Sequence, residues 1–148
     1  MRSALLLVFL SATVFAVVAQ ETPRKRWHFP ADDKAIVSQE PARPYTGNGL
    51  PEGVVSVLTK YREPGLRVRR PGGSGYWRFE NVAKLYYGGR LFAVVGAATC
   101  LSSTGQEMGC LNDLVIYDED GDGKLERPVN INDGNPPFSF HLPKWLQP

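Results

Sequence analysis

Glycine and proline divide this chain into short segments, which favours short strands joined by tight turns. The 148 residues include 15 Gly and 12 Pro, and both residue types interrupt regular structure. Between these breaks, β-branched, aromatic and other apolar residues gather in short runs, at 54–59, 66–69, 76–79, 82–87, 90–96 and 114–117. Such runs are typical of strands. The sequence therefore predicts a mainly β fold, a small antiparallel sheet or barrel.

Two turns indicate how these strands are joined. Gly88-Gly89 is a two-residue turn of the kind that needs positive φ, and it predicts a hairpin of 82–87 with 90–96. Glu63-Pro64-Gly65 is a second turn, and we expect it to pair 54–59 with 66–69. A helix is the alternative for residues 54–61, where apolar residues also have helical spacing, but their β-branched content favours a strand.

The N-terminal part of the chain differs from this middle part. Residues 1–19 have a short basic start, an apolar stretch and small residues before Gln20, which is the layout of a secretory signal peptide. The apolar stretch is shorter than the ~20 residues of a spanning helix, so we expect cleavage and no membrane anchor. Residues 20–52 are rich in proline and lack an apolar period, which predicts an extended arm. A single β-rich domain is expected at 53–148.

Proline also recurs in the C-terminal tail, residues 127–148, and excludes a long helix there. Phe138, Phe140 and Leu142 alternate with polar residues. This period of two predicts one more strand, at an edge of the sheet. Trp145 and Leu146 are expected to pack on the sheet as well.

Cys100 and Cys110 are the two cysteines of the chain. In an exported protein an isolated pair predicts a disulfide, with two buried thiols as the alternative. The bond would close an 11-residue loop, and closing a loop near that size stabilises a protein by ~3 kcal/mol. Because this loop precedes the predicted strand 114–117, we expect the disulfide to constrain the same end of the domain as the acidic loop that follows.

That acidic loop, residues 118–126, reads Asp-Glu-Asp-Gly-Asp-Gly-Lys-Leu-Glu. It places carboxylates at positions 1, 3, 5 and 9 with glycine at position 6, a pattern that suits the six to eight oxygen ligands of Ca²⁺. Mg²⁺ fits less well because it retains more water. The alternative is an acidic surface turn without an ion. An ordinary turn, however, needs far fewer carboxylates, and carboxylates packed together repel one another.

The loop resembles the calcium loops of EF-hands and dockerins and the D-x-D-x-D-G loops of many secreted β proteins. The resemblance covers nine residues and implies these ligands: side chains of Asp118, Asp120 and Asp122, the backbone carbonyl of Lys124, and Glu126. Val129 stands where an EF-hand has its bidentate glutamate, and Pro128 precedes it. The resemblance is therefore to the strand-flanked version, and we expect one structural Ca²⁺ rather than a regulatory or catalytic ion.

Charge is distributed unevenly along the chain. Residues 20–90 carry 13 Lys/Arg against 7 Asp/Glu, whereas residues 91–148 carry 3 against 8. In the basic part, Arg67 and Arg69 lie near Tyr76 and Trp77, and together they form a predicted ligand-binding face for an acidic polysaccharide or another polyanion. Nucleic acid is a less suitable partner for an exported chain. The alternative is an edge strand whose charges prevent aggregation.

Signatures of catalysis are sparse. The chain has two histidines, His28 and His141, and no motif for a nucleophile, a zinc site or a phosphate-binding loop. Carboxylate catalysis would require acidic residues to converge in space, the candidates being Glu80, Glu107, Asp113 and Asp133. We therefore predict a secreted or periplasmic, calcium-binding, non-catalytic structural or interaction domain. A polysaccharide-binding module is the first alternative, and a secreted hydrolase is the second.

Overall fold

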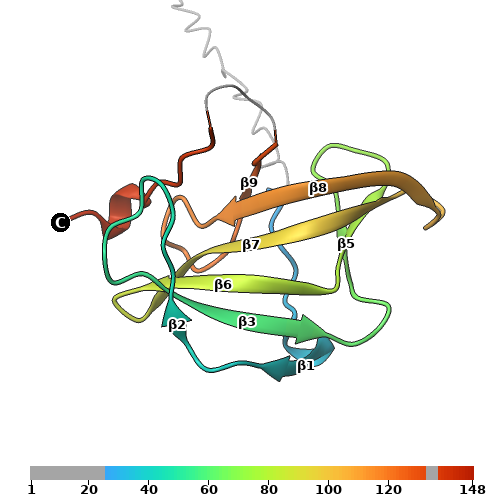
Figure 1. Cartoon of the computed structure of the whole chain (residues 1–148). Coiled ribbons are helices and arrows are strands. Elements are labelled where there is room, and N and C mark those ends of the chain that lie inside the picture. Colours follow the sequence, from blue (N-terminus) through green and yellow to red (C-terminus); the bar gives the residue numbers. More distant parts are fainter. Residues whose placement is uncertain (1–25, 133–136) are drawn as a thin grey trace, which may run out of the picture.

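The computed structural model describes residues 26–132 and 137–148, so the expected signal peptide at 1–19 lies outside the described residues. Within them, one antiparallel sheet of nine strands forms an open sheet and does not close into a barrel (Figure 1). The strands are β1 (Ile36–Gln39), β2 (Arg43–Pro44), β3 (Val55–Tyr61), β4 (Leu66–Arg69), β5 (Tyr76–Phe79), β6 (Asn81–Tyr87), β7 (Arg90–Leu101), β8 (Glu107–Tyr117) and β9 (Arg127–Asn130). Two short 3-10 helices, η1 (Asp33–Ala35) and η2 (Lys144–Leu146), complete the described elements. The predicted mainly β, antiparallel fold is confirmed.

A long hairpin organises the sheet. Gly88 and Gly89, with φ of 57° and 77°, form the predicted turn between β6 and β7. β5 precedes β6 with only Glu80 between them, and both strands pair with the same partner. Residues 98–101 of β7 pair with β5, and residues 90–95 pair with β6. β5 and β6 therefore act as one strand with a kink at Glu80.

The kink at Glu80 determines the neighbours of the remaining strands. β3 pairs with β6 on one side of the kink, and β4 pairs with β5 on the other. The predicted hairpin of residues 54–59 with 66–69 is therefore wrong, although both segments are strands. Gly96 of β7 lies opposite the kink, where an added Cβ would stand 3.0 Å from both Phe79 and Val82. A larger residue would have to displace both side chains, so the close approach of the two strands favours glycine at this position.

β8 completes the central part of the sheet on the other edge of β7, and β9 pairs with β8. The predicted disulfide joins Cys100 of β7 to Cys110 of β8, with the Cα atoms 5.4 Å apart. It lies near the beginning of β8, whereas the acidic loop follows the end of that strand (Figure 1). The expectation that both features constrain the same end is therefore wrong, because β8 is longer than the predicted segment 114–117.

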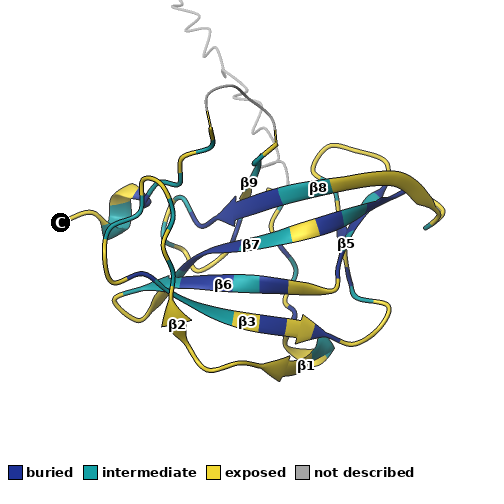
Figure 2. Ribbon diagram, viewed as in Figure 1, coloured by how far each residue is buried: buried dark blue, intermediate teal, exposed yellow. Residues whose placement is uncertain are grey.

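The central part of the sheet is buried on both faces, and Figure 2 shows its dark segments on β6, on β7 and on the last part of β8. Alternating residues of β6, β7 and β8 divide between two hydrophobic clusters. The first contains Val82, Val94 and Ile116, and the N-terminal segment covers it with Phe29. The second contains Leu85, Phe92 and Tyr117, and the tail covers it with Leu142. A sheet covered on both sides has few polar positions on its central strands.

The two terminal segments differ in part from expectation. The segment 20–52, expected as an extended arm, contributes β1 and β2, which both pair with β3. The tail packs on the sheet as predicted, but residues 138–142 form no strand. Instead, β9 occupies the edge of β8. Phe138 and Phe140 pack against the face of the sheet, and the amide of Phe140 donates to the carbonyl of Asn48 at 2.7 Å.

Candidate metal centre

The acidic loop connects β8 to β9, and hydrogen bonds fix both of its ends. The amide of Asp118 donates to the carbonyl of Phe92 at 2.8 Å, which ties the start of the loop to β7. The amide of Glu126 donates to the carbonyl of Tyr117 at 2.9 Å, which closes the loop on itself. The rigid strands on either side therefore hold positions 1 and 9 of the loop next to each other.

Four predicted carboxylates converge inside this loop. One side-chain oxygen from each of Asp118, Asp120, Asp122 and Glu126 lies within 4.8 Å of the others. Asp118 is 1% exposed, Glu126 is half-buried, and Asp120 and Asp122 are exposed. Oxygens at this spacing on a partly buried loop can surround a single cation. The predicted side-chain cluster is therefore present in the structure.

Backbone amides shape the first half of the cluster. The carboxylate of Asp118 accepts from the amides of Gly121 at 2.7 Å and Gly123 at 3.0 Å. Asp120 accepts from Asp122 at 3.1 Å, and Asp122 accepts from Lys124 at 2.8 Å. These short-range hydrogen bonds are the turns that aspartate forms with its own backbone. They curl the loop around the side chains at positions 1, 3 and 5.

Glu126 closes the cluster and carries an unsatisfied atom. Its Oε1 accepts from the amide of Glu119 at 3.0 Å. Its Oε2 is buried and has no hydrogen-bond partner among the described residues. A buried carboxylate oxygen without a partner is costly. This oxygen therefore calls for a positive or hydrogen-donating partner.

Burial and repulsion between neighbouring carboxylates raise the pKa values of Asp118 and Glu126. Burial raises the pKa of Asp118, the amides of Gly121 and Gly123 oppose the rise, and the charges of Asp122 and Asp120 add to it. The pKa of Glu126 is raised first by burial and then by the charges of Asp120 and Asp118, against the Glu119 amide. Both carboxylates are therefore less stable in their ionised form than they would be in water. A bound cation would reverse that preference.

Glu119, at position 2 of the loop, belongs to a different set of contacts. Its Oε1 lies 3.2 Å from Nη1 of Arg127 and 2.6 Å from Nε2 of His141. The His141 ring stacks on Tyr117 at a centroid distance of 4.0 Å. His141 thus connects the tail to the acidic loop through Glu119 and to β8 through Tyr117. Glu119 helps to join the tail to the loop and lies outside the four-carboxylate cluster.

Trp145, in η2 of the tail, supports the back of the loop. Its Nε1 donates to the carbonyl of Asp118 at 2.7 Å. Gly121, with φ of 77°, lies so close that an added Cβ would stand 2.9 Å from Cγ of Trp145. Sequence reasoning expected Trp145 to pack on the sheet but missed its contact with the loop. Trp145 lies 27 residues after Asp118, so no local sequence pattern indicated this contact.

The predicted basic face is only partly assembled. Arg67 and Arg69 point outward from β4, and they pair across the strands with Arg78 and Tyr76 of β5. The guanidinium of Arg67 lies 5.1 Å from the centre of the Tyr76 ring. Trp77 is 7% exposed and belongs to the first cluster, on the opposite side of β5. Strand alternation separates Trp77 from the other three residues, so it does not line this face.

Two of the acidic residues considered for catalysis lie far apart on one strand. Glu107 and Asp113 both lie on β8, six residues apart, which corresponds to ~20 Å along a strand. Glu107 instead forms an ion pair with Arg78 at 2.6 Å. Glu80 lies at the kink between β5 and β6, and Asp133 lies outside the described residues. Glu107 and Asp113 are thus too far apart to act as an acid–base pair.

One buried ionic cluster was missed by sequence reasoning. Asp32 and Lys84, each 8% exposed, form an ion pair at 2.9 Å. The hydroxyl of Tyr61 donates to the same Asp32 oxygen at 2.6 Å. A signal existed, because Lys84 alternates with Val82 at an inward position of β6. Asp32, in contrast, lies in the segment expected as an extended arm.

Comparison with protein-family models, curated proteins and solved structures finds no match to this chain. Among the residues that the structure describes, no helix has the length and apolar composition required to cross a bilayer.

Proposed function

We propose that this protein is a secreted, non-catalytic β domain stabilised by one Ca²⁺ bound in the acidic loop. Four side-chain ligands, Asp118, Asp120, Asp122 and Glu126, would hold the ion, and the carbonyl of Lys124 would add a backbone ligand. The observation that carries the proposal is the convergence of these four carboxylates within 4.8 Å. An oxygen-rich, partly rigid site of this kind suits calcium better than magnesium.

The electrostatics of the loop support a resident cation. Burial and repulsion raise the pKa of Asp118 and Glu126, and Glu126 Oε2 has no hydrogen bond within the described residues. A divalent ion would stabilise the ionised forms of Asp118 and Glu126 and would also give Glu126 Oε2 a positive partner. An acidic turn without an ion would leave both carboxylates and this oxygen without a compensating charge.

The location of the ion favours a structural role. The loop is joined to β7 through Asp118 and to the tail through Trp145. An ion at this junction would hold β8, β9 and the tail together. An ion that binds only the folded state adds RT ln(1 + [Ca²⁺]/Kd), ~2.7 kcal/mol at a hundredfold excess over Kd.

Export is part of the same proposal. The disulfide between Cys100 and Cys110 is of a kind that persists in oxidising compartments. Millimolar calcium is also available outside cells, in the affinity range of extracellular modules. The expected leader at 1–19 would provide the route.

Thermal unfolding of the oxidised protein in calcium, magnesium and EGTA tests the proposal. We expect calcium to raise the melting temperature and magnesium to raise it less. The Asp120→Ala/Asp122→Ala variant should lose the response to calcium, because it lacks two of the four side-chain ligands. Asp33→Ala/Glu52→Ala, which removes two exposed acids elsewhere, is the matched control and should respond like the unaltered protein. Equal melting temperatures in calcium and EGTA would refute the calcium site.

Polyanion binding is a second candidate function, favoured by an open groove of about 650 Å³ beside β4. Its lining includes Arg26, Arg67, Arg69 and Arg70 together with Tyr76. Arginines close together beside aromatic rings suit the sulfate or carboxylate groups of an acidic polysaccharide. The groove is large enough for a flexible chain.

Heparin chromatography provides the test of this second function. Arg67→Ala/Arg69→Ala should elute at lower salt than Arg43→Ala/Lys60→Ala, which removes the same charge from exposed positions on other strands. Equal elution of the two variants would show that retention depends on net charge and not on the groove.

A further inference from the structure

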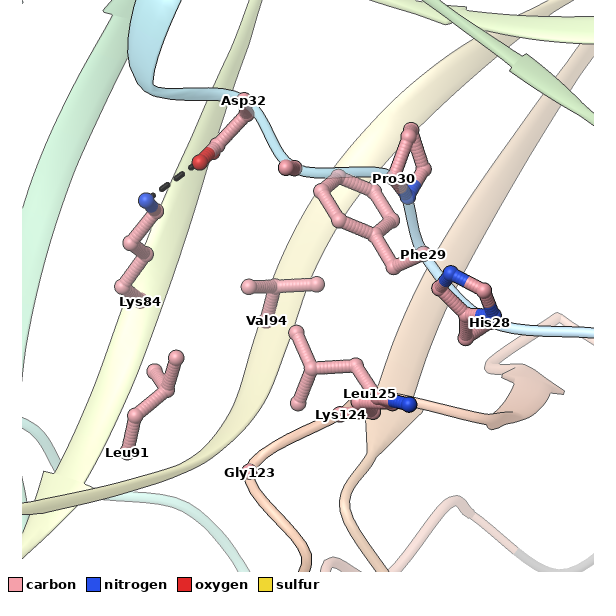
Figure 3. A pocket seen from close by; sticks show the side chains of 11 residues that line it. His28, Phe29, Pro30, Asp32, Lys84, Leu91, Val94, Gly123, Lys124 and Leu125 are labelled. Carbon is pink, nitrogen blue, oxygen red and sulfur yellow. Dashed lines mark ion pairs between the residues drawn. The ribbon is translucent and has the colours of Figure 1, made fainter.

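A separate pocket of about 280 Å³ opens between the N-terminal segment, the sheet and the acidic loop. Figure 3 shows the ion pair of Lys84 and Asp32 at one side of the pocket, with Val94 in the middle and Leu125 next to Val94. Lys84 projects from β6 and Val94 from β7, while Leu125 belongs to the loop between β8 and β9. Three distant parts of the sequence therefore build one cavity.

The charged groups of this pocket are removed from bulk water. The side chains of Lys84 and Asp32 are each 10% exposed and lie 2.9 Å apart. The Lys84 ammonium has three N–H donors, and the ion pair with Asp32 Oδ2 accounts for one of them. The Tyr61 hydroxyl donates to that same oxygen. The ammonium thus retains donor capacity at the pocket.

Stability alone does not explain a lysine at this position. A buried ion pair contributes little net stability relative to apolar residues of similar volume, because both charges must lose their hydration. Lys84 lies on the face of β6 that also presents Val82, a member of the first cluster. An apolar residue here would extend that cluster. The lysine is better explained by recognition of a ligand.

Size and charge define the ligand class. The volume of about 280 Å³ lies just below the ~300–1,000 Å³ typical of ligand pockets, which limits the occupant to a small molecule. Leu91, Val94 and Leu125 supply apolar walls. Lys84, paired with Asp32, supplies the N–H donors inside the pocket, whereas Lys124 in the lining is exposed. The lining therefore combines apolar surface with a buried ammonium that can donate to an anionic head group.

We propose that this pocket binds a small apolar carboxylate, with the carboxylate at Lys84 and the hydrocarbon part against Leu91, Val94 and Leu125. Binding here does not depend on the proposed calcium site, although Gly123, Lys124 and Leu125 belong to both the loop and the pocket lining. The bound carboxylate would accept the remaining N–H donors of Lys84, giving a charge-assisted hydrogen bond in a partly dry site.

Titration of the full-length, isotopically labelled protein with octanoate, octanol and octylamine tests the proposal. These three probes share one hydrocarbon chain and differ in the charge of the head group. We expect octanoate to bind saturably and to shift the amide signals of Lys84, Val94 and Leu125. Octanol and octylamine should bind about tenfold more weakly or worse, because octanol can accept a hydrogen bond from Lys84 but carries no negative charge, and octylamine is itself a cation. This comparison needs no altered protein.

Two variants and one control variant locate the site. Leu91→Trp places a large ring at the pocket wall and should abolish octanoate binding, whereas Leu111→Trp, at an exposed position of β8, should leave it unchanged. Lys84→Met/Asp32→Asn removes both charges together and keeps an acceptor for Tyr61. It should reduce octanoate affinity about tenfold and bring it close to that of octanol. The amide spectrum of each variant verifies its fold.

Three results would overturn the proposal: no saturable octanoate binding, equal binding of the three probes, or signal shifts confined to the arginines of β4. Each titration is run with calcium and with EGTA, and binding in either buffer supports the pocket. A protein that binds octanoate but shows no thermal response to calcium would retain this inference and refute the calcium site. A protein whose melting temperature responds to calcium but that does not bind octanoate would refute the pocket and retain the calcium site.

Discussion

Asp118 is deeply buried, and both oxygens of its carboxylate accept hydrogen bonds. Both of its carboxylate oxygens accept from glycine amides, and its own amide and carbonyl bond to β7 and to Trp145. Burial nevertheless outweighs these amides and raises its pKa. Glu126, across the loop, shows the same direction of shift. Two carboxyls with raised pKa values make the stability of the loop depend on pH.

The sign of this pH dependence differs between the calcium-free and calcium-loaded protein. Without calcium, the folded state binds more protons than the unfolded state between the ordinary carboxyl pKa of ~4 and the raised values. The contribution of Asp118 and Glu126 to stability is therefore largest at low pH and is lost as pH rises through this window. Calcium requires the ionised carboxylates, so its affinity should fall as pH falls through the same window.

Melting temperatures across this pH window in EGTA and in calcium provide the measurement. The gap between the two curves should widen as pH rises. Asp118→Asn/Glu126→Gln should flatten the EGTA curve and remove the gap. Curves for the variant that run parallel to those of the unaltered protein would contradict the assignment of the pH dependence to these two groups.

The two ends of β8 have different constraints. The disulfide crosses from β7 near the start of the strand, where Leu111 and Met108 are exposed. The end of the strand is buried, and Tyr117 has no exposed area. It leads directly into the acidic loop. The covalent link therefore secures the exposed end of the β7–β8 hairpin, and packing secures the other end.

We expect Cys100→Ala/Cys110→Ala to lower the free energy of unfolding by ~3 kcal/mol, because the unfolded chain loses a closed loop of this size. The increase in melting temperature with calcium should persist, since the disulfide and the acidic loop lie at opposite ends of β8. Chemical denaturation with and without calcium gives both quantities. Loss of the calcium response in this variant would show that the two ends are coupled.

Across the whole molecule, the two terminal segments act as covers for the two faces of one sheet. The N-terminal segment contributes Phe29 to one face, and its amide donates to the carbonyl of Leu125 in the loop at 2.7 Å. The tail contributes Leu142 to the other face and contacts the loop through Trp145. The acidic loop therefore lies where both covers meet the end of the sheet.

This arrangement predicts that the tail and the proposed ion stabilise each other. Trp145→Phe keeps the ring against Gly121 but removes the hydrogen bond to Asp118, so we expect a loss of ~1 kcal/mol and weaker calcium binding. Thr59→Val is the matched control, because it removes the hydrogen bond that Gln39 donates to the Thr59 hydroxyl at 3.2 Å on β3, which β6 and β7 separate from β8 and the loop. It should lose similar stability and retain calcium affinity, as measured by calorimetric titration. Equal calcium affinity in both variants would contradict the coupling.

Local chemistry made several features predictable from the amino-acid order. Gly88-Gly89 identified the hairpin because only positive φ fits that turn, and the spacing of carboxylates in residues 118–126 identified the cluster because ligands at positions 1, 3, 5 and 9 face inward in a tight loop. The paired cysteines identified the disulfide. Each of these features depends on neighbours close in the chain, so the residues themselves contain the necessary information.

Contacts between distant segments were decided by the tertiary structure. The kink at Glu80 assigned β3 and β4 to different partners, and the tail packed on a face instead of forming the predicted edge strand. Strand alternation placed Trp77 in the core, and folding brought Asp32 to Lys84 across 52 positions of the chain. These outcomes depend on how the whole sheet buries its apolar surface. No single segment of the sequence specifies how this surface is buried, because the free energy of packing depends on contacts among all the segments.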